Sequence, residues 1–383
     1  MNSGSCPSAE EKPGTSLASH AKLMALGPDS SEKIRSHHFP HIRMQHLSGL
    51  GVVGGGAWGT ALACLLAADR QMVRLWAYEE QTVRNIRERK ENPDFLPGIR
   101  IPASIHAFGD LDEMVSSCRT LIMAVPAQKT RGILGGMKGA LNSEHRFVIA
   151  SKGIETESGS LLSDILAEEM GTAEQVAVLS GPTFAREIAL QLPSAAVLAS
   201  TSEELGITLQ KTFHRPWFRL YRSSDMIGVQ VAGAVKNVLA IAAGIAEGLK
   251  LGLNARAALI CRGLAEMTRL GMKMGAEVET FAGMSGLGDL VLTATGPLSR
   301  NHALGIRLGE GVPPEECLST GKTVAEGAAT SISIHQLCSG IQMEMPICEA
   351  VYKILQGKKS CRETLSDLLN REVPESESGA FKA

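Results

Sequence analysis

Apolar and polar positions follow two different patterns along this chain. From about residue 48 to about residue 200, short apolar runs alternate with stretches that have apolar residues at helical spacing. Strands separated by helices are typical of a parallel sheet with both faces covered, so this part predicts an α/β fold. The expected strands are Gly51–Val53, Val73–Trp76, Thr120–Val125, Arg146–Ala150, Val176–Leu179 and Ala195–Ala199. The clearest expected helices are Gly59–Ala68, Glu80–Arg89 and Leu161–Glu169.

The strand pattern ends near residue 225, and only helical spacing follows. Apolar residues recur three to four positions apart at Val231, Val235, Val238, Ala242 and Ile245, and again at Leu259, Leu264, Met267 and Leu270. This pattern predicts an all-helical domain. The expected organisation is a sheet-containing domain over residues 46–224 and a helical domain over 225–371, flanked by a disordered extension (1–45) and a disordered tail (372–383). Translation that starts at Met44 is an alternative account of the extension.

Three glycines follow the first expected strand at the spacing that dinucleotide binding requires. They are Gly54, Gly56 and Gly59, and an alanine-rich helix begins among them. Gly54 permits a tight turn, Gly56 lacks the Cβ that would block a pyrophosphate, and Gly59 lets the helix pack close to the strand. The helix N-terminus directs free N–H groups at the phosphates. Because a strand, a helix and a second strand fall in register, the motif predicts a nicotinamide or flavin dinucleotide site rather than a plain turn.

Composition and charge restrict the remaining possibilities. The chain is 44% hydrophobic with a net charge of −2, so we expect large cores and no global attraction to nucleic acid or anionic membranes. The eight cysteines show neither a CxxC pair nor zinc spacing, so no metal site or disulfide is expected and a cytoplasmic location is the prediction. Cys64 and Cys261 lie in apolar helical patterns and are expected to be buried. No apolar stretch is long enough to predict a membrane span.

Polar residues after the expected strands are candidates for the site, because ligands of this fold lie beyond the carboxyl ends of the strands. Glu79 lies about twenty residues past the last glycine, where an acid accepts hydrogen bonds from a ribose. It is equally compatible with the start of the next helix, so the choice between NAD and NADP stays open. Lys152 suits either an anionic ligand or a solvated loop. The turn Ser180–Phe184 also follows a strand, so its hydroxyl and N–H groups are expected to face the same cleft, although such a turn by itself is generic.

Lys236 is the sharpest single candidate, because it lies on an amphipathic, alanine-rich helix. Desolvation by such neighbours lowers the pKa of a lysine toward the range useful for general acid–base catalysis. The alternative is a lysine that extends along the helix to water. Asp289 lies in a glycine-rich loop, where it suits an ammonium partner or a helix cap. Ser299–Asn301 offers a guanidinium and amides to a phosphate, or starts a surface helix.

Taken together, these motifs occur in one order that closely resembles the bacterial NAD(P)-dependent sn-glycerol-3-phosphate dehydrogenases. The resemblance rests on these segments: Gly54–Thr60, Ser151–Gly153, Ser180–Phe184, Gly233–Val238, Gly286–Leu290, Ser299–Asn301 and Val324–Gly327. It covers about residues 48–370. It implies a Rossmann-type doubly wound parallel sheet followed by an all-helical C-terminal domain, usually in a homodimer. The implied reaction is the reversible NAD(P)H-dependent reduction of dihydroxyacetone phosphate, with phospholipid synthesis as the consumer of the product.

The resemblance also implies a role for individual residues. Lys236 matches the catalytic lysine, with Asp289 and Thr293 as polar residues beside it. The positions that match substrate contacts are Lys152, Gly181, Thr183, Lys236, Asp289, Ser299, Arg300 and Asn301. The positions that match cofactor contacts are Gly54, Gly56, Ala57, Trp58, Gly59, Tyr78, Lys152, Ala185, Arg300, Val324 and Glu326.

One segment departs from the family pattern. Many relatives have Arg or His followed by Asp after the second strand, whereas this chain has Tyr78 and Glu79. The loss of a cation that meets a 2′-phosphate predicts that both cofactors are used, with a smaller NADPH bias than in relatives with Arg. Two other functions are kept as alternatives: a 3-hydroxyacid-type dehydrogenase that accepts a carboxylate, and a non-catalytic NAD(P)-binding sensor or scaffold.

Overall fold

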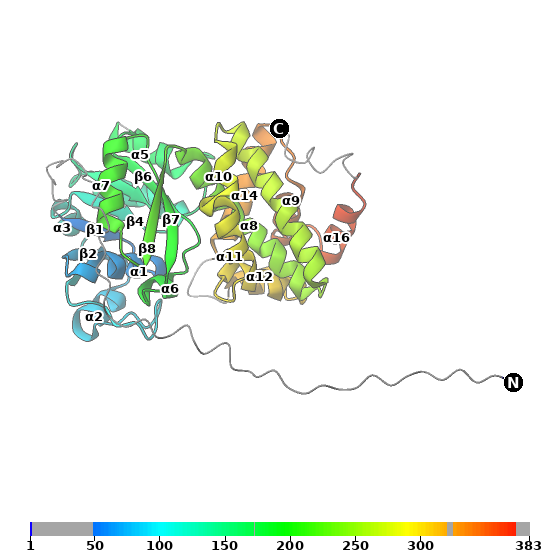
Figure 1. The fold of residues 1–383 in the computed structure, drawn as a ribbon, viewed down its shortest axis with the longest axis horizontal. Helices are drawn as coiled ribbons and strands as arrows, with labels where there is room; N and C mark the ends of the chain where they lie inside the picture. Colours follow the sequence, from blue (N-terminus) through cyan, green and yellow to red (C-terminus); the bar gives the residue numbers. More distant parts are fainter. Residues whose placement is uncertain (2–48, 172, 320–324, 373–383) are drawn as a thin grey trace. The chain divides into compact units, whose positions relative to one another are not determined.

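The computed structural model describes Met1 and residues 49–171, 173–319 and 325–372 (Figure 1). The predictions of a disordered extension over 1–45 and a disordered tail over 372–383 fall, but for Met1 and Glu372, outside these residues. The described residues from Gly49 to Glu372 belong to one compact unit. The predicted boundary near residue 224 lies between the last strand, which ends at Ser223, and the long helix that begins at Met226.

One sheet of eight strands forms the first half of the described chain (Figure 1). The strand order is β3-β2-β1-β4-β5-β6-β7-β8, and β1 to β6 are mutually parallel. The order reverses between β1 and β4, which opens a crevice at the carboxyl ends of these two strands. The strands are β1 (Leu50–Val53), β2 (Val73–Trp76), β3 (Ile105–Phe108), β4 (Thr120–Met123), β5 (Arg146–Ile149), β6 (Val176–Ser180), β7 (Ser194–Ala199) and β8 (Phe218–Ser223).

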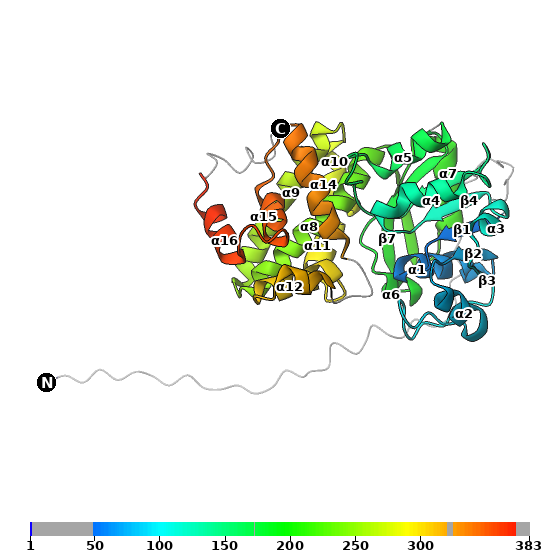
Figure 2. The same ribbon diagram turned by 180° about the vertical axis from the view of Figure 1, so that it is seen from behind.

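Helices cover both faces of the sheet (Figure 2). Leu50 and Val52 of β1 pack into the core under α1 and α7, whereas Val53 packs into the core under α3, α4 and α5. Successive side chains of a strand point to opposite faces, so a strand covered on both sides is apolar throughout. The helices are α1 (Ala57–Leu66), α2 (Glu80–Arg89), α3 (Leu111–Ser116), α4 (Thr130–Met137), α5 (Leu162–Met170), α6 (Ala185–Ala189) and α7 (Glu203–Phe213), with short 3-10 turns at Ala67–Asp69 and Ala127–Lys129.

Two strands differ from the expected pattern. The apolar runs did not predict β3 or β8, which lie at the two edges of the sheet. In β8, buried Phe218 and Leu220 alternate with exposed Arg219 and Tyr221, so no continuous apolar run marks it. The sheet is mostly parallel, as predicted; β7 runs antiparallel to β6 and parallel to β8, so these two strands run opposite to the other six.

The second half of the described chain is helical, as predicted. Its centre is α8 (Met226–Gly248), which is almost wholly buried and packs against α9, α11, α12, α14 and α15. The other helices are α9 (Gly252–Lys273), α10 (Val278–Ala282), α11 (Asp289–Thr295), α12 (Arg300–Gly309), α13 (Pro314–Ser319), α14 (Glu326–Gly340), α15 (Pro346–Leu355) and α16 (Cys361–Leu369), with a π-helical turn, η3, at Met284–Gly288. By length and composition α8 alone among the described helices is suited to a membrane span, but 94% of its apolar window is buried inside the protein.

Helices α8 and α12 touch backbone to backbone. Gly244 and Gly248 of α8 face Gly305 and Gly309 of α12. A Cβ added to Gly244 would lie 2.9 Å from the Cα of Gly305, and one added to Gly248 would lie 2.9 Å from the Cα of Gly309. Any side chain larger than hydrogen therefore separates the two helices.

The prediction of burial is confirmed for Cys64 and wrong for Cys261. Cys261 is exposed on α9. The helical spacing of Leu259, Leu264 and Met267 suggested an inward face that included it, but only the second half of α9 is deeply packed. Its first half leaves apolar residues such as Leu253 exposed to solvent.

Candidate active site

The glycine-rich loop connects β1 to α1, and each of its three glycines has the conformation, the close contact or the open space expected of it. Gly54 has φ of +122°, and its N–H donates to the carbonyl of Trp76 (3.0 Å). A Cβ on Gly59 would overlap the carbonyl oxygen of Gly54, so the helix lies directly against the strand. Gly56 precedes the first turn of α1, and a Cβ there would meet nothing within 4 Å. The space in front of Gly56 is therefore open to a phosphate, and the N–H groups of the first helical turn point there.

Ala57 and Trp58, the first residues of α1, follow the loop. The indole N–H of Trp58 donates to the carbonyl of Ala150 (3.0 Å), which ties the loop to the end of β5. Lys152 lies two residues further along the chain, so this hydrogen bond places the lysine near the dinucleotide loop.

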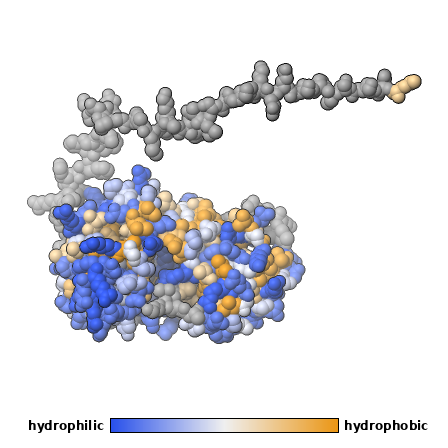
Figure 3. Space-filling view, turned by 90° about the horizontal axis from the view of Figure 1, so that it is seen from below, coloured by the Kyte–Doolittle hydropathy of each residue, from blue (hydrophilic) through white to orange (hydrophobic). Residues whose placement is uncertain are grey.

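The end of β2 carries the two residues that depart from the family pattern. Tyr78 is 83% exposed, and its ring lies edge-on to the ring of Trp76, with ring centroids 6.5 Å apart. Glu79 is the residue before α2, so it lies at a helix start as well as at the carboxyl end of a strand. In Figure 3, α2 presents a hydrophilic face. Neither side chain has a described contact with Lys152, Lys236 or Asp289.

Three charged side chains meet at the junction of the two halves. The Asp289 carboxylate accepts from Lys236 Nζ at Oδ1 and from Lys152 Nζ at Oδ2, each at 2.7 Å. Lys236 Nζ also donates to the hydroxyl of Thr293 (2.7 Å). Asp289 is 1% exposed and Lys236 is 5% exposed, so the lysine does not extend to water as the alternative interpretation required. One buried carboxylate thus holds a lysine from each half of the protein.

The environment of Lys236 places its titration close to neutral pH. Desolvation lowers the pKa of Lys236 to about 7, with a smaller contribution from the charge of Lys152, while the Asp289 carboxylate opposes the shift. Both protonation states are therefore accessible near pH 7, as a general acid–base group requires.

A π-helical turn sets the position of Asp289. Such turns insert one extra residue into a helix and are frequent at functional sites. A side chain at Gly286, within η3, would overlap the backbone of Phe281, so only glycine permits this path. Thr293 follows Asp289 by one turn of α11, and its hydroxyl donates to the Asp289 carbonyl (2.6 Å). The lysine therefore meets two fixed oxygen atoms.

The turn after β6 contributes backbone rather than charge. Gly181 has φ of +143°, and a Cβ there would lie 2.9 Å from the Cα of Ala196. Its carbonyl accepts from Lys152 Nζ (3.3 Å) and from the Thr183 hydroxyl (3.1 Å). Ala185 begins α6 and has no described contact with the lysines.

The start of α12 lies beside Lys236. Ser299 caps the helix by accepting from the N–H of His302 (3.2 Å). Asn301 is buried; its amide donates to Asn237 Oδ1 (2.9 Å) and accepts from the N–H of Gly327 (3.0 Å). Asn237 is next to Lys236 on α8, so this hydrogen bond connects the two candidate groups. Asn237 lies in the Gly233–Val238 segment, but no signal in the sequence predicts that it fixes Asn301.

Charge in this region is mostly positive. Arg300 is exposed at the first turn of α12, and Glu326 is partly exposed at the first turn of α14. Burial raises the pKa of Glu326 to about 7, and the charges of Arg300, Lys152 and Lys236 oppose that shift. Val324, another expected cofactor contact, lies outside the described residues.

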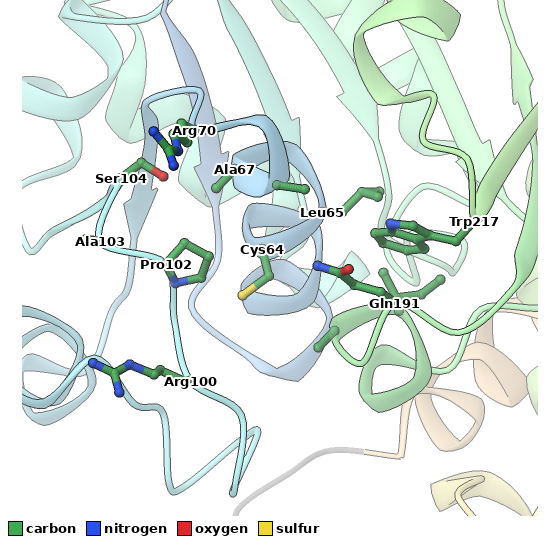
Figure 4. Close-up of a pocket in the computed structure, with 13 residues that line it drawn as sticks. Cys64, Leu65, Ala67, Arg70, Arg100, Pro102, Ala103, Ser104, Gln191 and Trp217 are labelled. Carbon is green, nitrogen blue, oxygen red and sulfur yellow. The ribbon is translucent and has the colours of Figure 1, made fainter. Parts of the chain in front are cut away.

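A cavity of about 490 Å³ lies elsewhere, beside the C-terminal half of α1 (Figure 4). Its lining includes Cys64, Arg70, Arg100, Gln191 and Trp217 and none of the predicted site residues. The cavity therefore lies apart from the predicted site residues. Among the described residues, no group of three or more His, Cys, Asp or Glu is arranged to hold a metal ion.

Comparison with known proteins gives one consistent result. Family models described as the N-terminus and the C-terminus of NAD-dependent glycerol-3-phosphate dehydrogenase match residues 49–206 and 225–366. A glycerol-3-phosphate dehydrogenase [NAD(P)+] of Citrifermentans bemidjiense is 46% identical over 327 residues, covering 85% of this chain and 97% of that protein. The protein of the same name from Geobacter sp. is 44% identical, covering 85% and 97%. The crystal structure of glycerol-3-phosphate dehydrogenase from Coxiella burnetii superposes with a TM-score of 0.82 at 39% identity, covering 85% and 99%.

Proposed function

This chain belongs to the NAD-dependent glycerol-3-phosphate dehydrogenase family, and from that premise we propose that it catalyses the reversible reduction of dihydroxyacetone phosphate to sn-glycerol 3-phosphate with NADH or NADPH. The observation that carries the proposal is Lys236, a buried lysine with a pKa near 7 held by Asp289 and Thr293. It lies at the junction between the sheet, with its open glycine loop, and the helical half. Glycerophospholipid synthesis is the proposed consumer of the product.

The glycine-rich loop fits a dinucleotide. The open space at Gly56 and the free N–H groups of the first turn of α1 would hold its pyrophosphate, with Ala57 and Trp58 beside it. When bound, the reduced nicotinamide supplies the hydride that adds to C2 of the ketone. Lys152, Ala185, Arg300 and Glu326 are the proposed contacts at the nicotinamide side of the cofactor.

Lys236 is the proposed proton donor. Hydride addition at C2 turns the carbonyl oxygen into an alkoxide, and the Lys236 ammonium stabilises that charge and donates one proton to give the alcohol. In the reverse direction neutral Lys236 accepts the proton from the C2 hydroxyl. Asp289 holds the ammonium in place and keeps its pKa from falling further. Asp289 and Thr293 therefore set both the position and the proton affinity of the donor.

The substrate phosphate is assigned to the start of α12. Arg300 supplies a guanidinium fork, and the hydroxyl of Ser299 and the amide of Asn301 lie on the same turn. The Asn301–Asn237 hydrogen bond fixes this turn relative to Lys236. Gly181, Thr183 and Lys152 would contact the other side of the substrate. Such positioning converts binding free energy into a lower barrier for the hydride step.

The test follows the near-ultraviolet absorbance of the reduced nicotinamide when purified protein meets dihydroxyacetone phosphate. We expect oxidation with NADH and with NADPH that requires the phosphorylated ketone and disappears in Lys236→Ala. Turnover of 3-hydroxyacids in its place would favour the hydroxyacid alternative. Cofactor binding without any turnover would favour the sensor alternative.

We further propose a homodimer in the cytoplasm. The exposed apolar residues of the first half of α9, with Leu251 before it, suit a second copy of the chain: Leu251, Leu253, Ala257, Ala258 and Cys261. The seven cysteines of the described residues are all free, as in a reducing compartment. Sedimentation of the wild type and of Leu253→Glu tests the dimer, and cell fractionation tests the location. A monomeric wild type would contradict the first proposal.

The domain division is proposed at residue 224, with residues 46–224 binding the dinucleotide and 225–371 carrying the lysine and the phosphate anchor. The strand-to-helix change between Ser223 and Met226 supports it. Limited proteolysis that yields fragments ending near this point would agree with the division.

A further inference from the structure

Asn92 reaches from a distant loop to the glycine-rich loop. It lies after α2, and its side-chain Nδ2 donates to the carbonyl oxygen of Gly55 and to the hydroxyl of Thr60, each at 2.8 Å. The Thr60 hydroxyl in turn donates to the same carbonyl (3.2 Å). Asn92 is 1% exposed and Thr60 is 0% exposed, so water does not compete for these hydrogen bonds. The Gly55 carbonyl is thus held by two donors.

Because the peptide bond between Gly55 and Gly56 is trans, the position of the Gly55 carbonyl also determines where the Gly56 N–H points. In the peptide unit that joins Gly55 to Gly56, the C=O and the N–H point in opposite directions, and the described residues contain no cis peptide. A Gly55 carbonyl that points into the protein toward Asn92 therefore directs the Gly56 N–H outward. A Cβ on Gly56 would meet no atom within 4 Å, so there is open space beside Gly56. That space is assigned above to the pyrophosphate.

The orientation of the Asn92 amide leaves its own oxygen without a hydrogen bond in the part of the chain that the structure describes. Its Oδ1 is buried with no hydrogen-bond partner among the described residues. Reversing the amide would place that oxygen against the Gly55 carbonyl oxygen, so the orientation with the donor facing the loop is the only favourable one. The backbone of Asn92 is itself fixed, because its carbonyl accepts from the N–H of Leu96 (2.8 Å), a core residue.

We propose that Asn92 is a positioning residue for the cofactor: by holding the Gly55 carbonyl, it aims the Gly56 N–H at the pyrophosphate. This inference rests on the proposed function of the loop as the dinucleotide site. The proposed role requires a hydrogen-bond donor at position 92. A carboxylate of the same shape would push the Gly55 carbonyl away instead of holding it, because its oxygens repel the carbonyl oxygen.

The experiment measures NADPH binding to the whole protein by fluorescence, without substrate, from pH 5 to pH 8.5. At pH 8 we expect Asn92→Asp to weaken NADPH binding by about tenfold or more. A carboxylate that repels the Gly55 carbonyl oxygen costs more free energy than the simple loss of the neutral hydrogen bond. The carboxyl, forced against a carbonyl, has a raised pKa, so its protonation at low pH restores a donor and part of the affinity. Asn92→Ala should lose less, about threefold, with no added pH dependence.

Controls separate positioning from general damage. Asn85→Asp places the same acid at a buried position that lies on α2, away from the glycine-rich loop contacts of Asn92, and its NADPH affinity should stay within about twofold of wild type. The KM for dihydroxyacetone phosphate, at saturating NADPH, should change little in Asn92→Asp. Wild-type affinity in both Asn92 variants, or an equal loss in Asn85→Asp, would overturn the proposal. If wild type binds NADPH without turnover, the proposed reaction fails while this binding test stands.

A second pair of variants tests the proposal in case the Asn92→Asp protein fails to fold. Thr60→Val keeps the volume and removes the hydroxyl that donates to Gly55, whereas Thr60→Ser keeps the hydroxyl. We expect about threefold weaker NADPH binding in Thr60→Val and near wild-type binding in Thr60→Ser. Equal affinities in these two variants would contradict a role for the hydrogen bonds to the Gly55 carbonyl.

Discussion

The two halves of the site are built in different ways. On the sheet side, a continuous segment from Gly54 to Gly59 presents main-chain N–H groups, so the binding surface follows from local spacing along the chain. On the helical side, Lys236, Asp289 and Arg300 come from three helices, and they meet only because those helices pack against one another. A surface made of backbone is sensitive to added side-chain volume, whereas a surface made of side chains is sensitive to the loss of a charge. The predictions below test that difference, from the largest expected effect to the smallest.

Loss of the lysine should have the largest effect. Lys236→Ala is expected to lower kcat by about a hundredfold or more, because the developing alkoxide loses both its counter-charge and its proton donor. Stopped-flow or steady-state rates with dihydroxyacetone phosphate measure it. NADPH affinity should stay near wild type, and Lys273→Ala, at the exposed C-terminal residue of α9, should leave kcat unchanged. A Lys236→Ala enzyme with more than a tenth of wild-type kcat would exclude the proton-transfer role.

Removal of the phosphate anchor should raise KM more than it lowers kcat. Arg300→Ala is expected to increase the KM for dihydroxyacetone phosphate about tenfold or more, the size expected for a lost charge-assisted hydrogen bond. Steady-state kinetics at saturating NADPH measure this, with Arg262→Ala on α9 as the control cation. An unchanged KM together with weaker NADPH binding would move Arg300 wholly to the cofactor side.

The pH profiles of the two directions should be opposite. Because desolvation lowers the pKa of Lys236 to about 7, ketone reduction needs the protonated form and should fall as pH rises above about 7, by up to about tenfold per unit. Alcohol oxidation needs the neutral form and should fall as pH drops below about 7. Asp289→Asn removes the anion that opposes desolvation, so the midpoint of kcat/KM should move to lower pH. An unmoved midpoint would assign the titration to another group.

Cofactor preference should show the smallest effect. Tyr78 and Glu79 place no cation at the end of β2, so kcat/KM for NADPH is expected to exceed that for NADH by well under about a hundredfold. Tyr78→Arg should shift the ratio toward NADPH, and Tyr78→Phe should not. A hundredfold NADPH preference in the wild type would show that other residues read the 2′-phosphate.

The same difference explains what the sequence could predict. The glycine spacing and the helical repeat around Lys236 are local signals, and the structure has the corresponding strand, loop and helix. The edge strand β8 alternates apolar and polar residues over a short run, and nothing local reveals that β7 reverses direction. The contacts of Asn92 and Asn237 join positions 37 and 64 residues apart, so only the folded chain brings them together. The exposure of Cys261 depends on which helices cover α9, and helical spacing does not specify that.

The glycine contact between α8 and α12 has a consequence for the range of substrates. Lys236 is on α8 and the proposed phosphate anchor is at the start of α12, and the two helices meet through main chain at Gly244 and Gly305. Side-chain repacking cannot bring them closer, and any larger residue at the contact would push them apart. The separation between the reacting oxygen and the phosphate is therefore set by the backbone. We expect the enzyme to select ketone phosphates by the number of carbons between these groups, and to discriminate less by what is attached elsewhere.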